Sequence, residues 1–310
     1  MVGMQNKRLA TLLVLATAAI SGVSNFVNKI AVTAVKDPVL YTTAKNVLVA
    51  LALVGVMLGA KKWGEVKNAS RKQLLLLFAI GAVGGSVPFA LYFTGLTMTS
   101  AVNAAFIHKT LFLWVFLFAY PFLKERMTFP QLVGVAAIFG ANIFVGGFTG
   151  FAYNAGELMI LCAAILWGAE NVLAKKVLAG LSSNTVATAR MAIGALLLTL
   201  YLLLFGGGFG AFAALHGAAW GWLALTSALL FGYVTTWYAA LKRAPATYVT
   251  TLLVPSTLVT NALSAAFVTH TFGGWDLVST ILFIAGVACV IFFARRMPRG
   301  TEEIAPAASA

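Results

Sequence analysis

Four charged side chains interrupt otherwise apolar stretches of this sequence: Lys45, Lys109, Glu170 and Arg190. An ionisable group that is withdrawn from water is costly unless it pairs, faces a wet cavity or reaches back to the surface. Residues of this kind either hold a structure together by pairing or bind and move charged species. These four are therefore the first candidates for chemistry in this chain.

Lys109 and Glu170 lie deepest, about 12 and 21 Å from the outer ends of their apolar runs at 1.5 Å per helical residue. Opposite charges about 9 Å apart in depth can be linked by long side chains or water. Two interpretations stay open. In one, they form a structural ion pair that joins two halves of the molecule. In the other, Lys109 meets an anionic or zwitterionic substrate while Glu170 titrates as a coupling carboxylate.

Lys45 and Arg190 lie nearer the ends of their runs, each about 10 Å deep. Their long stems allow the charged groups to snorkel toward water, so a shared architectural role competes with substrate contact. His108 directly precedes Lys109 and points about 100° away round a helix. It is either a packing histidine or part of a proton relay.

Aromatic residues accompany these charges. Tyr92 lies in one apolar run, and Trp237 and Tyr238 lie in another at corresponding positions. They can line a binding cavity or face lipid.

The motifs of several enzyme classes are absent. The sequence has no phosphate-binding Gly-Lys-Ser/Thr loop, dinucleotide fingerprint, zinc-ligand spacing or nucleophile elbow. Its two cysteines, Cys162 and Cys289, form neither a metal motif nor a disulfide framework. We therefore expect no enzyme, no ATP-driven pump, no metal site and no cofactor.

The composition explains where these residues must lie. Of 310 residues, 61% are hydrophobic and only 9% are charged, whereas soluble domains carry about 25% charged residues. A soluble globular protein is excluded. Continuous apolar runs of about 20 residues predict membrane-spanning helices, and their lack of alternation excludes a β-barrel. The sequence predicts an all-α integral membrane protein with ten spans, at 9–32, 38–59, 73–97, 101–121, 130–147, 156–178, 184–205, 217–240, 247–270 and 275–294.

The net charge of +13 indicates how the chain is oriented in the membrane. Cytoplasmic loops are enriched in Lys and Arg, and no long polar segment is present to bind nucleic acid. We expect a multi-pass protein of the plasma (inner) membrane with both termini cytoplasmic. Alternate connections hold sixteen of the 21 basic residues, namely Lys7, Arg8, Lys61, Lys62, Lys67, Arg71, Lys72, Lys124, Arg126, Lys175, Lys176, Lys242, Arg243, Arg295, Arg296 and Arg299.

The chain matches itself at an offset of 145 to 146 residues. Residues 20–29 fall over 166–175, Lys45 over Arg190, and Tyr92-Phe93 over Trp237-Tyr238. Each unit has five spans, so the second enters the bilayer from the opposite side. Inverted repeats are typical of alternating-access transporters with a site near the midplane. We divide the chain into a cytoplasmic N-terminus (1–8), two five-helix repeats (9–147 and 156–294), and a cytoplasmic, disordered tail (295–310).

A Gly-x-x-Asn-x-x-x-Lys element occurs in both repeats, as Gly22, Asn25 and Lys29 and again as Gly168, Asn171 and Lys175. Trp167 precedes the second copy, Lys45 and Arg190 are early in the second helix of each repeat, and Leu123-Lys124-Glu125-Arg126 closes the fourth helix. With these residues the sequence resembles the drug/metabolite transporter superfamily, specifically a ten-helix protein with two EamA-type repeats. The resemblance implies a multi-pass transporter in which helices three, four, eight and nine, with one and six, surround a central cavity, so that Trp167 and Asn171 become candidate substrate contacts.

The sequence departs from the family pattern at two places. Thr269-His270-Thr271 replaces a Gly-Glu-Arg-like element, and Thr110 stands where a proline often breaks the fourth helix. Pro255 is at the equivalent position of span nine, so a kink is predicted for span nine only, which would make the cavity asymmetric. Gly84-Gly85-Ser86-Val87-Pro88 in span three permits either close helix packing or a gating bend.

These observations favour a secondary transporter that exports a small metabolite, an amino acid or other carboxylate-bearing compound, by alternating access with protons as the candidate coupling ion. Three basic groups lie deep within the spans, namely Lys45, Lys109 and Arg190, against the single deep acid Glu170. This excess of positive charge favours a substrate that carries a carboxylate. One alternative is a lipophilic-cation efflux transporter that uses Glu170. Another is a non-transporting membrane scaffold. The sequence predicts no particular oligomeric state.

Overall fold

A computed structural model describes residues 2–144, 150–205, 209–213, 215 and 217–294. All regular structure within these ranges is helical, which confirms the all-α prediction. The expected disordered tail, 295–310, lies outside the described residues.

The first repeat contains α1 (Val2–Val35), α2 (Pro38–Gly59), α3 (Gly64–Lys67), α4 (Arg71–Gly85), α5 (Val87–Thr97), α6 (Ala101–Lys109), α7 (Leu111–Leu123), α8 (Phe129–Ala141) and the 3₁₀ turn η1 (Asn142–Phe144). The second contains α9 (Ala155–Val177), α10 (Ser183–Phe205), α11 (Phe209–Ala213), α12 (Ala218–Arg243), α13 (Ala246–Thr251), α14 (Ser256–Ser264), the π-helical turn η2 (Ala265–Thr269) and α15 (Gly274–Ala294).

Among the described residues, nine helical segments are long and apolar enough to cross a membrane, and the shorter apolar segment Phe129–Phe144 takes the fifth position. These segments match the ten predicted spans. The first helix begins at Val2, ahead of the expected start at residue 9. Large apolar side chains such as Leu51, Leu204 and Phe205 are exposed on the outside of the bundle, as a lipid-facing surface requires.

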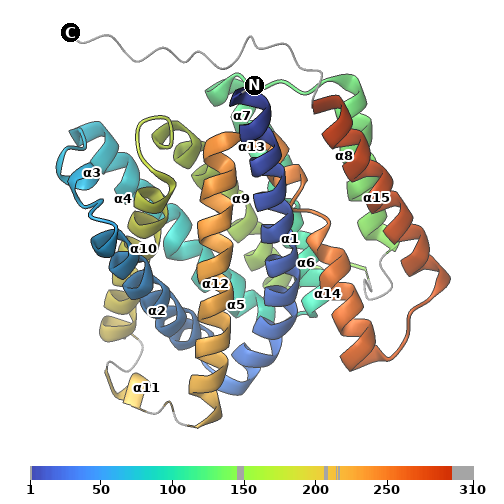
Figure 1. The fold of residues 1–310 in the computed structure, drawn as a ribbon. Helices are drawn as coiled ribbons and strands as arrows, with labels where there is room; N and C mark the ends of the chain where they lie inside the picture. The colour runs from blue at the N-terminus through green and yellow to red at the C-terminus, as the bar shows by residue number, and fades with distance from the viewer. Residues whose placement is uncertain (1, 145–149, 206–208, 214, 216, 295–310) are drawn as a thin grey trace.

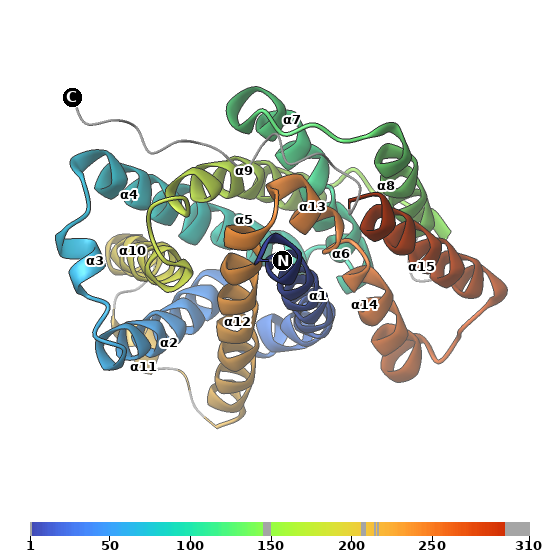
Figure 2. The same ribbon diagram turned by 45° about the horizontal axis from the view of Figure 1, so that its top comes forward.

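The two repeats pack with reciprocal contacts, which Figures 1 and 2 let the reader follow. The first helix of each repeat lies against the third of the other: α1 against α12, and α9 against α4 and α5. Likewise α2 packs on α10, α8 on α15, α6 on α14 and α7 on α13. Each of these contacts thus has a counterpart with the halves exchanged, the packing expected of an inverted repeat.

Three spans are interrupted in mid-course. Span three breaks at Ser86, span four at Thr110 and span nine between Thr251 and Ser256. The prediction of a kink in span nine only was therefore wrong. The Thr110 hydroxyl donates to the Ile107 carbonyl (2.7 Å), and the Thr110 N–H donates to the same carbonyl (3.0 Å). A threonine thus tightens the chain into an i to i−3 turn without a proline.

Close backbone contact brings α4 and α10 together. A Cβ atom on Gly85 would lie 2.1 Å from the carbonyl oxygen of Arg190, and one on Gly194 would lie 2.2 Å from that of Gly85. Small residues at such a crossing let two helices approach closely in a membrane. The crossing fixes the position from which the Arg190 side chain projects from α10.

We predict that Gly85→Ala lowers the free energy of unfolding by about 1–3 kcal/mol, because the added methyl group has no space. The measurement is unfolding in mixed detergent micelles, with Gly55→Ala as the matched control. Gly55 is also helical, but a Cβ there meets nothing within 4 Å. Equal stability of the two variants would contradict tight packing at this crossing.

Two carboxylates of the first repeat cap helices of the second at the end of the bundle that carries the N-terminus (Figure 1). Glu65 accepts hydrogen bonds from Ser182 N (2.9 Å) and Thr185 Oγ1 (2.7 Å) at the start of α10. Glu125 accepts from Ala246 N (2.8 Å) and Thr247 N (2.9 Å) at the start of α13. Carboxylates at helix N-termini satisfy free N–H groups and favour the helix dipole.

The Glu65 carboxyl is outside the spans, and two opposing effects act on its pKa. Partial burial raises this pKa, whereas the hydrogen bonds from Ser182 and Thr185 lower it, with a smaller contribution from Lys62. The net pKa is below the usual value. Glu65 therefore contributes stability above its unfolded-state pKa of about 4.3, and this is lost as pH falls through the lowered folded-state pKa.

We predict that Glu65→Gln melts at a lower temperature than the wild type at pH 7 and that this difference shrinks as the pH falls below about 4. Thermal unfolding of both proteins in detergent across this pH range measures the effect. A difference in melting temperature that is independent of pH would mean that the Glu65 charge is unimportant.

Candidate functional site

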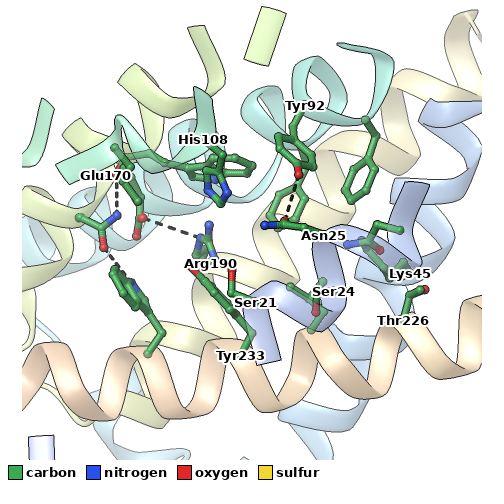
Figure 3. Close-up of a pocket in the computed structure, with 18 residues that line it drawn as sticks. Ser21, Ser24, Asn25, Lys45, Tyr92, His108, Glu170, Arg190, Thr226 and Tyr233 are labelled. Atoms are coloured by element: carbon green, nitrogen blue, oxygen red, sulfur yellow. Dashed lines mark hydrogen bonds and ion pairs between the residues drawn. The ribbon is translucent and has the colours of Figure 1, made fainter. Parts of the chain in front are cut away.

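A polar pocket lies between the two repeats (Figure 3). It has about 670 Å³ of unfilled space, open solvent at its mouth included. Helices α1, α2, α5, α6, α9, α10 and α12 and the first residue of α7 supply its wall. The lining residues are Ser21, Ser24, Asn25, Asn28, Lys45, Phe89, Tyr92, Phe93, His108, Leu111, Trp167, Glu170, Asn171, Arg190, Thr226, Leu230, Tyr233 and Trp237.

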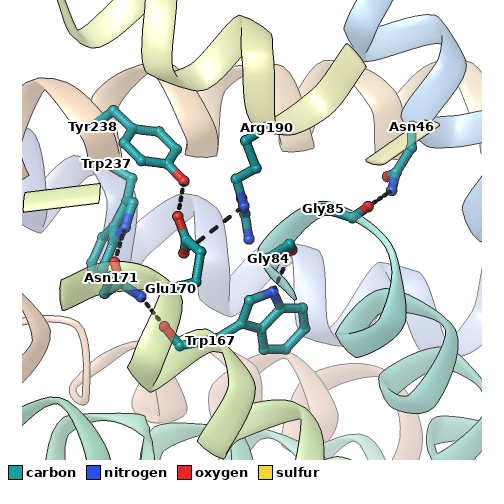
Figure 4. Close-up of polar contacts among 9 residues, drawn as sticks. All are labelled: Asn46, Gly84, Gly85, Trp167, Glu170, Asn171, Arg190, Trp237 and Tyr238. Carbon is teal, nitrogen blue, oxygen red and sulfur yellow. Dashed lines mark hydrogen bonds and ion pairs between the residues drawn. The ribbon is translucent and has the colours of Figure 1, made fainter. Parts of the chain in front are cut away.

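One part of the pocket holds an ion pair from the second repeat (Figure 4). Arg190 Nε lies 3.9 Å from Glu170 Oε2, and the Tyr238 hydroxyl donates to the other oxygen of the same carboxylate. Glu170 is 1% exposed and Arg190 5%. Within the described residues this is the only ion pair. Charge in this part of the pocket is therefore balanced internally.

Lys109 has different neighbours. Its Nζ donates to Ser21 Oγ (2.9 Å) and lies 3.5 Å from His108 Nδ1. The structure does not pair it with Glu170, so the interpretation in which these two residues tie the repeats together was wrong. The reason is geometric. Helix α10 crosses α4 at close range, and this crossing brings Arg190, which is equivalent to Lys45 in the repeat, against Glu170 instead.

Lys45 lies in another part of the pocket, on the far side of Asn25 from Arg190 in Figure 3. Its Nζ is 3.8 Å from the centre of the Phe93 ring and 4.9 Å from that of Tyr41, and it donates to Asn28 Oδ1 (3.3 Å). The side chain is 1% exposed. It does not snorkel to the surface as expected, because the aromatic faces stabilise the ammonium group inside.

The repeated asparagine of the sequence motif makes the same contact in both halves. Asn25 Oδ1 accepts from the Tyr92 hydroxyl (3.1 Å), and Asn171 Oδ1 accepts from Trp237 Nε1 (2.8 Å). The offset between these pairs is the one that relates the repeats. Asn171 also donates to the Trp167 carbonyl (2.7 Å). The asparagines thus join the first and third helices of each repeat at the pocket wall.

The repeated lysine of the motif caps a helix. Lys29 Nζ donates to the carbonyls of Leu96 and Thr99 at the end of α5, both at 2.7 Å. Lys175 Nζ makes the equivalent bonds at the end of α12, both at 2.8 Å. A cation at a helix C-terminus satisfies free carbonyl groups and favours the helix dipole. This part of the motif is structural.

His108 lies in an aromatic enclosure at the pocket wall. Its ring centre is 4.9 Å from that of Trp167 and 5.3 Å from that of Tyr92. Trp167 is fixed in turn, because its Nε1 donates to the Gly84 carbonyl at 2.9 Å (Figure 4).

Of the ten site residues predicted from the sequence, eight line the pocket, and Lys109 and Tyr238 lie outside its wall. Several small and polar residues of α1 and α12 also line the pocket, although their sequence context predicted no site role for them. The repeat alignment carried a usable signal for two of the residues missed, since Ser24 falls over Glu170 and Phe93 over Tyr238. The residues not predicted are Ser21, Ser24, Asn25, Asn28, Phe89, Phe93, Leu111, Thr226, Leu230 and Tyr233.

Within the described residues, nine membrane-spanning helices and one shorter apolar segment form two inverted repeats with a pocket between them. This arrangement defines a multi-pass membrane transporter. The EamA-like transporter family matches residues 8–147 and 154–292, and the chain belongs to this family, which fits the drug/metabolite transporter superfamily. Each repeat accounts for one copy of the family's domain.

Two comparisons extend this result. An uncharacterized transporter of Methanothermobacter thermautotrophicus (strain ATCC 29096 / DSM 1053 / JCM 10044 / NBRC 100330 / Delta H) is 22% identical over 152 residues. That match covers 47% of this chain and 44% of the relative, so the chain spans less than half of the relative's length. A solved crystal structure of a protein superposes with a TM-score of 0.73 at 19% identity, covering 96% of this chain and 99% of the other, and shares the fold.

The Glu170 and Arg190 pair can be tested by a double-mutant cycle. We predict that Arg190→Met alone destabilises the protein by about 3–5 kcal/mol, because it leaves a buried carboxylate without its partner. Glu170→Gln combined with Arg190→Met then costs less than the sum of the single changes. Unfolding in mixed micelles gives the three values, and additive losses would show that the two groups do not interact.

Proposed function

We propose that this protein is a secondary active transporter that exports a small carboxylate-bearing metabolite, such as an amino acid, by alternating access. The observation that carries the proposal is the pocket shared by two inverted repeats, lined by cations, amides and aromatic rings. We propose transport without a catalysed reaction. We also propose that the protein lies in the plasma (inner) membrane with both termini cytoplasmic, which the distribution of Lys and Arg supports.

The charges of the pocket support an anionic group on the substrate. The lining contains two cationic side chains, Lys45 and Arg190, and one acid, Glu170. That acid is already paired with Arg190. One positive charge is left to be balanced. The rings of Tyr92, Trp167 and Trp237 favour an apolar or aromatic remainder on the same substrate.

The alternatives fit these contacts less well. A lipophilic cation would need a free carboxylate, whereas Glu170 is held by Arg190 and by the Tyr238 hydroxyl. A non-transporting scaffold would be expected to fill the space between its repeats with packed side chains, and the pocket argues against that.

The contacts of Glu170 support a proposed coupling to protons. Protonation of this carboxylate removes the charge that holds Arg190, and so frees a second cation toward the pocket. A proton and an anionic substrate would then bind in a linked manner and cross the membrane together, so that export occurs when their combined gradients point outward.

We predict that proteoliposomes containing the wild type move 3-phenylpropionate or L-phenylalanine faster when a pH gradient is applied, and that Glu170→Gln loses this acceleration. Without a titrating carboxylate, the gradient has nothing to act on at this position. Flux of the radiolabelled compounds is the measurement, and monodisperse elution in detergent checks that the variant is folded.

Glu157→Gln is the matched control, because it makes the same change on the same helix outside the pocket. It is expected to keep the response to pH. An unchanged response in Glu170→Gln would refute the coupling role. Flux of tetraphenylphosphonium but of neither carboxylate would favour the cation transporter.

A further inference from the structure

The two repeats differ in charge at one set of equivalent positions. In the second repeat, Glu170 is held by Arg190 and by the Tyr238 hydroxyl. The alignment of the repeats places Ser24 over Glu170, Lys45 over Arg190 and Phe93 over Tyr238. The matching contacts of Asn25 and Asn171 with the third helices show that this alignment holds in space.

The first repeat keeps the cation of this set and lacks the acid. Where the second repeat has a carboxylate and a phenol, the first has the hydroxymethyl group of Ser24 and the plain ring of Phe93. Lys45 is 1% exposed, and no carboxylate of the described residues lies within ion-pair distance of it. Its polar contact is a single amide oxygen, Asn28 Oδ1 at 3.3 Å. An ammonium group in this setting lacks a counter-charge.

Two hydrogen-bonding groups that line the pocket with Lys45 also lack partners. Ser24 Oγ and Asn25 Nδ2 are buried without a hydrogen-bond partner. Because Asn25 Oδ1 accepts from Tyr92, its Nδ2 is left as a free donor. Both residues line the pocket together with Lys45, and Figure 3 shows them between Tyr92 and Thr226. Buried polar groups without partners are rare, and a ligand is one reason for them.

We propose that the carboxylate of the substrate binds at Lys45, Ser24 and Asn25, and so supplies the counter-charge that Glu170 supplies in the second repeat. Lys45 provides the charge, and Ser24 Oγ and Asn25 Nδ2 donate hydrogen bonds to the carboxylate oxygens. The rest of the substrate extends along the aromatic wall of the pocket. This inference rests on the proposed function and assigns the anion-binding end of its site.

The first experiment compares 3-phenylpropionate with 3-phenylpropanamide, which has the same shape without the charge. We expect the acid to raise the melting temperature of the detergent-solubilised wild type and the amide to leave it unchanged. Lys45→Met is expected to weaken binding of the acid by about tenfold or more, as loss of a charge-assisted hydrogen bond does. Lys45→Arg, which retains the positive charge, is expected to preserve the preference for the acid.

The second experiment builds the missing carboxylate into the protein. Ser24→Glu is expected to pair with Lys45, to raise the melting temperature without ligand, and to abolish stabilisation by 3-phenylpropionate. Ser24→Gln is the matched control, because it has the same size without the charge. It is expected to give neither the added stability nor the full loss of binding, so the comparison stays informative if Lys45→Met fails to fold.

Equal stabilisation by the acid and the amide, or equal binding of the acid by Lys45→Met and the wild type, would overturn the proposal. So would identical behaviour of Ser24→Glu and Ser24→Gln. These results are distinguishable from a failure of the proposed function. If flux of 3-phenylpropionate is the same with and without Lys45, the proposed binding site is refuted and the transport function stands. If no carboxylate is transported but binding still depends on charge, the transport function is refuted and the binding site stands.

Discussion

The ion pair of Glu170 and Arg190 lies where neither side chain reaches bulk water, and much of the surrounding structure follows from keeping it there. A Cβ on Gly84 would lie 2.3 Å from Glu170 Cγ, so only glycine leaves room for that side chain. The contact of α4 with α10 at Gly85 sets the distance from which Arg190 reaches across. Buried opposite charges hold a unique arrangement only when the geometry around them is fixed, and here backbone contact fixes it.

The sequence was sufficient for the spans and for the duplication, because hydropathy and repeat spacing are local or periodic signals. It was insufficient for the partners of the charged groups. Depth along a helix predicted that Lys109 and Glu170 lie near one another. Contacts are decided instead by how the helices rotate and cross. In the structure Glu170 pairs with Arg190, and Lys109 donates to Ser21. The break at Thr110 was missed for a related reason: a hydroxyl can tighten a turn as a proline does, and composition does not distinguish it.

One departure from the family pattern, the Thr269-His270-Thr271 segment, is explained once the helix caps of the two repeats are compared. At the start of α6, Ser100 caps the helix with its own side chain. At the equivalent start of α13 stands Pro245, which has no capping side chain, and Glu125 from the other repeat takes that role. Position 270, the repeat partner of Glu125, can therefore be a histidine, since α6 needs no carboxylate from outside.

Two identical inverted repeats would give inward-open and outward-open forms of equal energy, so any preference must arise where the repeats differ. Electrostatic differences in this chain include the acid at Glu170 against Ser24 in the pocket and the carboxylate cap of α13 at one end of the bundle. A ligand shifts a conformational equilibrium only by interacting differently with the two forms. Under the proposed function, an anionic substrate and a proton both act on the first difference, because each adds or removes charge there. The asymmetry of the sequence is thus the physical means by which a bound solute can act on a symmetric scaffold.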